Sequence, residues 1–81
     1  MKNSPTVIEK KLGRQKASGQ AWEDENRIEI DPRLDSKEYF LTLIHEQLHL
    51  IFPNWSEKEV SRIEKRIGNF LWKQNYRKVK L

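Results

Sequence analysis

Residues 39–52 form an apolar run without glycine or proline, and this run limits the fold more than any other part of the sequence. Ahead of it, Asp35 and Glu38 have the spacing of a capping box, which marks the start of a helix. Behind it, Pro53 prevents a helix from continuing. A helix that is apolar on more than one side lies in the middle of its domain. We therefore expect a central helix over residues 36–52.

A second helix is expected over residues 56–75, antiparallel to the first. Ser56 and Glu59 repeat the capping-box spacing directly after the Pro53 break. The residues that follow separate into an apolar stripe with helical spacing and a basic outer face. The apolar stripe comprises Val60, Ile63, Ile67, Phe70 and Leu71, and the outer face carries Lys58, Arg62, Lys65, Arg66 and Lys73.

The N-terminal part of the chain favours strands. Residues 27–31 (RIEID) alternate between apolar and charged side chains, which is the period of a half-buried strand, and Pro32 ends the pattern. The preceding turn residues, 24–26, indicate a hairpin or an edge strand. Residues 6–12 form a weaker candidate strand, and residues 14–21 resemble a loop or irregular arm. The expected fold class is α+β: one domain over residues 1–81, with a strand and loop arm at 1–26 and an edge strand at 27–31.

The chain is too short and too polar for a large core. A domain of 81 residues buries about 60% of the surface that its unfolded chain exposes. Small domains of this kind often need a disulfide or a structural metal. Because the sequence has no cysteine, disulfides and thiolate zinc sites are excluded. Any metal must therefore be held by imidazole and carboxylate groups.

The net charge of +4 gives weak support for an anionic partner such as a nucleic acid. Clusters of lysine and arginine are most often solvated faces, and no aromatic residues alternate with them as in a stacking platform. The N-terminus lacks the apolar segment of a secretory signal, and no run is long enough to span a membrane. We expect a cytoplasmic protein without a membrane partner. The sequence gives no indication of the oligomeric state.

Both histidines of the chain lie in the central helix, in the sequence HEQLH at residues 45–49. On a helix, His45 and His49 lie on the same face one turn apart, so their imidazoles can bind one cation. Glu46 lies about 100° from His45, where its carboxylate reaches beside the cation rather than binding it. Ile44, Leu48 and Ile51 are suited to bury the opposite face. The pattern is that of HExxH zinc sites: two ligands and a general base.

An HExxH site needs a third protein ligand and one open position. Zinc lowers the pKa of a bound water, and the glutamate takes the proton as the water attacks a carbonyl group. The alternative to a catalytic zinc site is a pair of buried histidines with hydrogen-bond partners, or a purely structural metal. Helical phase does not choose a third ligand, because Glu57, Glu59 and Glu64 of the second helix all flank its apolar stripe.

Through HEQLH, the chain resembles the zincin metallopeptidases, and residues 56–63 (SEKEVSRI) resemble the glutamate-bearing helix of their gluzincin branch. Its layout is similar to short zincin-like proteins from phages and prophages. The resemblance covers about residues 27–72. It implies that His45 and His49 are zinc ligands, that Glu46 is the base, and that a glutamate of the second helix is the third ligand. It also implies that residues 27–31 form an edge strand that pairs with an extended peptide substrate.

Among the three glutamates, Glu57 is our choice of third ligand. It comes just after the chain reversal and precedes Val60 and Ser61 as gluzincin ligands precede a small or apolar pair. Glu59 already has a role in the capping box, and Glu64 is the alternative ligand. Full-size zincins add a second subdomain that supplies oxyanion donors. Here Tyr76 or Arg77 could approach the site as an electrophile, and the alternative for Tyr76 is a terminal packing residue.

Two functions are therefore expected. The first is hydrolysis of peptide bonds by a zinc-dependent metallopeptidase that uses Glu46. The alternative is a non-catalytic binding module, stabilised by zinc, for a peptide or nucleic acid partner. The glutamate after His45 favours the first, because a structural pair of histidines does not need it.

Overall fold

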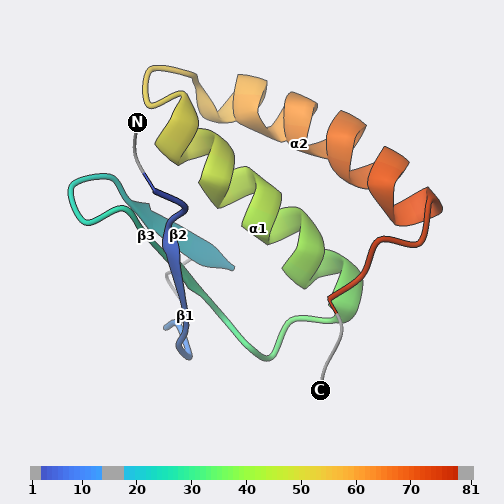
Figure 1. The fold of residues 1–81 in the computed structure, drawn as a ribbon, viewed down its shortest axis with the longest axis horizontal. Helices are drawn as coiled ribbons and strands as arrows, with labels where there is room; N and C mark the ends of the chain where they lie inside the picture. The colour runs from blue at the N-terminus through green and yellow to red at the C-terminus, as the bar shows by residue number, and fades with distance from the viewer. Residues whose placement is uncertain (1–2, 14–17, 79–81) are drawn as a thin grey trace.

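The computed structural model describes residues 3–13 and 18–78, which form a small sheet, a central helix and an outer helix (Figure 1). No helix in this part of the chain is long and apolar enough to cross a membrane. The fold is α+β, as expected. Its elements are β1 (Thr6–Glu9), β2 (Gly19–Trp22), β3 (Arg27–Ile30), α1 (Ser36–Ile51) and α2 (Glu57–Lys73).

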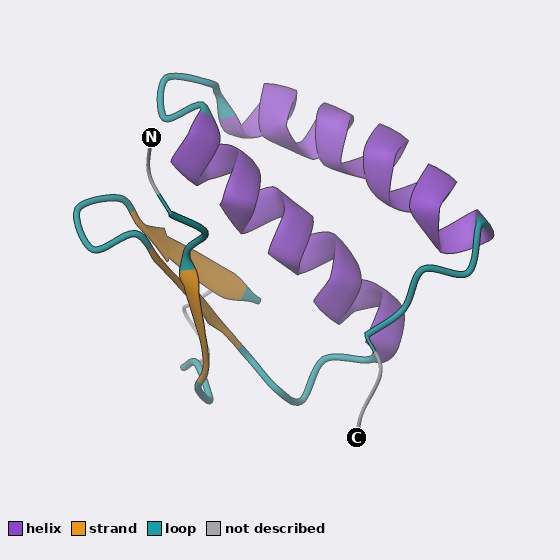
Figure 2. Ribbon diagram, in the orientation of Figure 1, coloured by secondary structure: helices purple, strands orange, loops and turns teal. Residues whose placement is uncertain are grey.

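The sheet has three strands in the order β1-β3-β2. Strands β2 and β3 form an antiparallel hairpin around the polar turn at residues 23–26, and β1 pairs with β3 in parallel. Ile28 and Ile30 are almost fully buried on the face of the sheet that packs against α1. Strand β1 forms one edge of the sheet, and its side chains are exposed. The layers are therefore the sheet, then α1, then α2 (Figure 2).

Two expectations for the strands are wrong. The strand at 27–30 is the central one rather than an edge strand, because β1 pairs with its second side. Residues 19–21 belong to β2 rather than to a loop, because they pair with residues 28–30 of β3 and Gly19 is small enough to pack closely against α1. Residues 14–17 of the expected loop lie outside the described part of the chain.

Both helices begin where the capping boxes predict. The Asp35 carboxylate accepts a hydrogen bond from the Glu38 backbone N–H at 2.8 Å, and the Ser56 hydroxyl accepts one from the Glu59 N–H at 3.1 Å. Helix α1 ends one residue before the expected boundary, next to Pro53. Helix α2 is one residue shorter at its start and two at its end than expected, which is within the usual variation of helix ends.

The two helices cross closely at Gly68. A Cβ atom there would lie 2.2 Å from Leu41 Cδ2, so the Leu41 side chain would have to shift to admit any other residue. Val60 is fully buried, but Ile67 and Phe70 are 43% and 63% exposed. The expected apolar stripe of α2 is therefore only partly covered. Ile51 of α1 is also exposed, in contrast to the expectation that it is buried.

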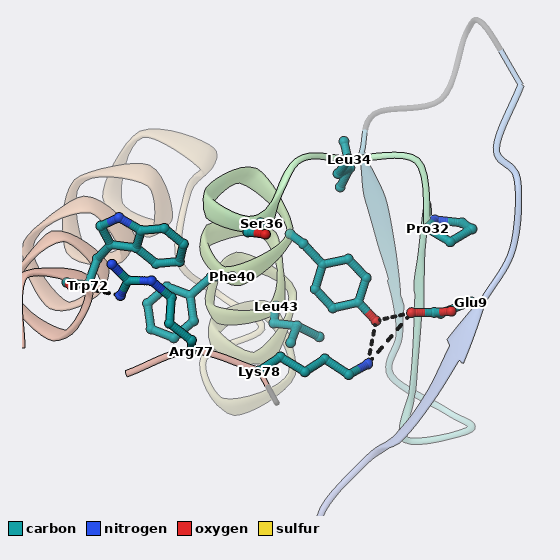
Figure 3. Close-up of a pocket in the computed structure, with 10 residues that line it drawn as sticks. Glu9, Pro32, Leu34, Ser36, Phe40, Leu43, Trp72, Arg77 and Lys78 are labelled. Carbon is teal, nitrogen blue, oxygen red and sulfur yellow. Dashed lines mark hydrogen bonds and ion pairs between the residues drawn. The ribbon is translucent and has the colours of Figure 1, made fainter. Parts of the chain in front are cut away.

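The segment after α2 folds back to the start of α1 (Figure 3). The Tyr39 hydroxyl donates a hydrogen bond to Glu9 Oε2 at 2.6 Å and accepts one from Lys78 Nζ at 3.1 Å. The Arg77 guanidinium lies 3.4 Å from the centroid of the Trp72 ring. This segment therefore links α1, α2 and β1 through side chains.

Asp31 fixes the loop between β3 and α1. Its carboxylate accepts hydrogen bonds from Arg33 N and Nε at 2.9 Å, from Arg33 Nη2 at 2.6 Å, and from the Leu12 N–H at 3.2 Å. The side-chain hydrogen bond from Arg33 is the main cause that holds the pKa of Asp31 well below its usual range. The charged form of Asp31 is thus the one that the fold favours.

Replacing this carboxylate should give a pH-dependent loss of stability. A group whose pKa is depressed in the folded state contributes stability above its unfolded pKa of about 3.9, and this contribution is lost as the pH falls through its folded pKa. We expect Asp31→Asn to be less stable than the wild type at about pH 7, with a smaller difference at about pH 3. Urea denaturation at both values measures this. An equal difference at the two pH values would contradict it.

Candidate metal centre

Helices α1 and α2 bring the three expected ligands together. His45 and His49 lie one turn apart on α1, and Glu57 is the first residue of α2, directly after the chain reversal. The potential ligand atoms of these three side chains all lie within 4.8 Å of one another. The short connection at residues 52–56 explains this, because it places the start of α2 beside the end of α1.

The distances between the ligand atoms suit a small divalent cation. His45 Nε2 lies 3.2 Å from His49 Nε2 and 3.1 Å from Glu57 Oε2, and His49 Nε2 lies 2.5 Å from Glu57 Oε1. Ligands at the usual zinc bond lengths of about 2.0–2.1 Å in a tetrahedron are roughly 3.3 Å apart. Two of the three distances agree with this value, and a small movement of the exposed Glu57 side chain would satisfy the third.

The donor set also suits zinc. Two imidazoles and one carboxylate are the ligands of many catalytic zinc sites, in which the fourth position stays open. Two imidazole nitrogens that face each other also need either a shared proton or a shared cation. His45, His49 and Glu57 therefore fit a zinc ion, and their assignment as its ligands stays a prediction.

Glu64 lies behind His45 rather than among the three. Its Oε1 is 2.8 Å from His45 Nδ1, and its side chain is only 12% exposed. A carboxylate at this position accepts the Nδ1–H bond, which leaves His45 Nε2 free to face His49 and Glu57. The alternative third ligand thus has the geometry of a residue that orients a ligand.

Substitutions of Glu64 can distinguish a residue that orients His45 from a residue that binds the metal. We expect Glu64→Ala to weaken zinc binding by about 10–100-fold, because the His45 ring loses its orientation. Glu64→Gln should retain most of the affinity, because its amide oxygen still accepts the Nδ1–H bond. Competition with a chromophoric chelator measures both. Equal losses in the two variants would show that the Glu64 charge itself binds the metal.

Glu46 is the buried carboxylate of the site. It is 7% exposed, lies against Gly19 of β2, and contributes to the wall of the groove described below. Burial raises the pKa of Glu46 above its ordinary value, while the neighbouring His45 and His49 act in the opposite direction. Among the described residues, no hydrogen bond or ion pair engages this carboxylate. A raised pKa and free oxygens are properties of a general base.

A groove of about 400 Å³ runs beside the three ligands. Its walls are β2, the second half of α1 and the start of α2. It is lined by Gly19, Ala21, Glu23, His45, Glu46, His49, Leu50, Pro53 and Glu57. The site therefore opens to solvent along the sheet edge.

The outer edge of β2 forms one side of this groove. Asp31 N donates to Ser18 O at 3.0 Å, so the backbone groups of alternate residues 18, 20 and 22 face β3. Those of Gly19 and Ala21 therefore face outward, where no other described strand pairs with them. Ala21 is partly exposed, whereas Gly19 is buried. Strand β2, rather than the expected residues 27–31, is therefore the edge strand beside the site.

A side chain at position 19 would separate the sheet from the site. A Cβ atom on Gly19 would lie 2.8 Å from Thr42 Cγ2, 3.0 Å from the Glu29 carbonyl oxygen and 3.2 Å from Glu46 Cγ. We expect Gly19→Ala to cost about 1–3 kcal/mol of the free energy of unfolding, because a backbone atom cannot move aside cheaply. Gly13→Ala is the control, since nothing lies within 4 Å of its Cβ position. Urea denaturation measures both variants, and an equal free energy of unfolding for the two would contradict this.

A second cavity, of about 230 Å³, lies at the other end of α1 (Figure 3). Arg77 lines it, stacked on Trp72, and Tyr76 is 62% exposed. Neither residue lines the groove beside His45 and His49. Tyr76 and Arg77 are therefore not placed to act as an electrophile at the site, because both follow the far end of α2.

Two features of the site were not predicted from the sequence: β2 as the edge strand, and Glu64 as the partner of His45. The signal for β2 was the pair of small residues at 19 and 21, which indicate a close approach of backbone to another element. The position just after the chain reversal favoured Glu57 over Glu64 as a ligand, but no sequence signal indicated that Glu64 contacts His45 Nδ1, since this depends on where α2 crosses α1.

Comparison with protein-family models, with curated proteins and with solved structures finds no match to this chain. The geometry of the site is therefore what supports a function.

Proposed function

We propose that this protein is a minimal zinc-dependent peptidase of the zincin type. One observation carries the proposal: a buried glutamate, two histidines one turn apart and a second carboxylate gather on the wall of an open groove. A structural zinc site would instead close its fourth position with a protein ligand. Among the described groove-lining residues, no further histidine or cysteine is available to do so.

Each part of the groove has a role in peptide hydrolysis. The outward backbone groups of β2, above all those of the partly exposed Ala21, would hold an extended peptide. A zinc ion held by His45, His49 and Glu57 would supply Lewis-acid activation of a water molecule and of the scissile carbonyl. The Glu46 carboxylate would accept the proton from that water and pass it to the leaving amine.

The second candidate is a zinc-stabilised peptide-binding module without catalysis. One observation favours it: apart from the three ligands, the described groove-lining side chains include no hydrogen-bond donor for an oxyanion. The same groove and the same free edge of β2 would then bind a peptide without cleaving it. The two candidates share the metal site and differ only in turnover.

Hydrolysis of an unfolded protein distinguishes the peptidase from the peptide-binding module. The protein is loaded with zinc and incubated with denatured casein and with a broad library of quenched fluorogenic peptides. The peptidase proposal expects cleavage that a chelator abolishes and added zinc restores. Stoichiometric zinc binding without cleavage of any substrate would overturn the peptidase proposal in favour of the binding module. Failure to bind zinc would exclude both.

A further inference from the structure

Two of the three acidic residues of α2, Glu57 and Glu64, lie on the side of the helix away from its basic residues. Glu57 and Glu64 contact the imidazoles of α1, and Glu59 lies beside the N-cap Ser56. The basic residues are all exposed. We call them the basic stripe: Lys58, Arg62, Lys65, Arg66 and Lys73.

The basic stripe is narrow and long. At 100° per residue, its five members fall within an arc of about 100° and extend about 22 Å along the helix axis. Glu57 and Glu64 lie far outside this arc, Glu59 lies at its border about 20° beyond Arg66, and Asn69 is the only uncharged residue within it. Helix α2 is the outer layer of the molecule, so the arc faces away from the rest of the protein (Figure 1).

This arrangement opposes the stability of the helix. Arg62 follows Lys58 by four residues, and Arg66 follows Arg62 by four, and like charges at this spacing destabilise a helix. Within the described part of the chain, no ion pair involves any member of the stripe. A helix face that served only solubility would mix both signs of charge. An anionic partner would remove the repulsion.

We propose that the basic stripe binds the phosphate backbone of duplex DNA without reading its sequence. The arc has no apolar or aromatic side chain, whereas a protein interface has an apolar core and a single-strand site has stacking aromatics. A row of cations instead matches a regular polyanion. Helix α2 could approach these phosphates along the major groove of B-DNA, which is about 12 Å wide and admits a helix. The major groove of duplex RNA is too narrow for this.

The stripe does not depend on the proposed peptidase function. Glu57 and Glu64 mark the side of α2 that faces α1 and the groove, and the stripe occupies the opposite side. Bound DNA would therefore leave the groove open. Binding can be measured on the protein whether or not it cleaves peptides.

The test is fluorescence anisotropy with a labelled duplex of about 20 base pairs at about 50–200 mM salt. If all five side chains neutralise phosphates, the slope of log K against log salt is about −4.5, and the affinity falls about 500-fold over this range. The stripe variant Arg62→Gln/Arg66→Gln should make the slope shallower by about 1.8 and weaken binding at least tenfold at about 100 mM salt.

The control variant is Lys10→Gln/Lys11→Gln, which changes the net charge by the same amount at exposed positions after β1. It should leave the affinity within about twofold of the wild type, because these lysines lie outside the stripe. Glutamine is a good helix former, so the stripe variant should melt no lower than the wild type. The second stripe variant Lys65→Gln/Lys73→Gln should also weaken binding about tenfold.

Three results would overturn the proposal. The first is equal weakening in the stripe and control variants, which would indicate a general effect of net charge. The second is binding of the single strand or of duplex RNA at least as tightly as the DNA duplex. The third is binding of phosphatidylserine vesicles with no affinity for the duplex, which would indicate a membrane surface.

Discussion

Glu46→Gln is expected to lower the rate of peptide hydrolysis by about 10²–10⁴-fold while leaving zinc binding unchanged. Glutamine has nearly the same shape as glutamate, but its amide cannot accept a proton. The substitution leaves the three expected ligands in place, since Glu46 lies on the sheet-facing side of α1 against Gly19. Burial also opposes the charged form of Glu46, so the fold should tolerate the neutral amide.

The measurements are kcat/KM on the best peptide substrate, zinc stoichiometry and thermal melting. The matched control is Glu23→Gln, which alters an exposed glutamate in the same groove and should reduce the rate by less than about threefold. If Glu46→Gln retained full activity, another group would have to be the base. If it lost zinc as well, Glu46 would be a ligand rather than a base.

Glu57→Ala is expected to weaken zinc binding by at least tenfold, because it removes the only carboxylate among the three expected ligands. The loss should also appear in stability. Zinc at about 1,000 times its dissociation constant adds about 4 kcal/mol to the free energy of unfolding. At the same free zinc concentration, a tenfold weaker site adds about 1.4 kcal/mol less.

Glu59→Ala is the control for this substitution. It lies two residues further along α2, and its side chain is near the Ser56 hydroxyl rather than the imidazoles. It should cost about 0.5–1 kcal/mol with or without zinc, because it weakens only the start of α2. A zinc-independent loss in both variants would remove Glu57 from the site. Zinc affinity that depended on Glu64 instead would identify Glu64 as the ligand.

The helical half of the fold could be predicted from local signals. Asp35 and Ser56 cap the helices as their spacing indicates, and Pro53 ends α1. These signals are reliable because capping and proline effects act within one turn of the chain. The positions of His45, Glu46 and His49 on one helix followed from the same local geometry.

The sheet could be predicted only in part. The alternation at residues 27–30 identified β3, but the identity of its neighbours depended on pairing between residues about 20 positions apart. Glycine is unfavourable in isolated strands, so residues 19–22 gave a loop signal. Packing against Thr42 and Glu46 overrides that preference, because a larger residue would not fit there.

The sequence by itself determined the two capped helices and the spacing of the two imidazoles, because both depend on the regular geometry of a single helix. Only the tertiary structure decided that Glu57 joins the histidines, that Glu64 supports His45, and that β2 is the strand beside the groove. These depend on the crossing of α2 over α1 and on the order of the strands. Both are set by packing between distant parts of the chain.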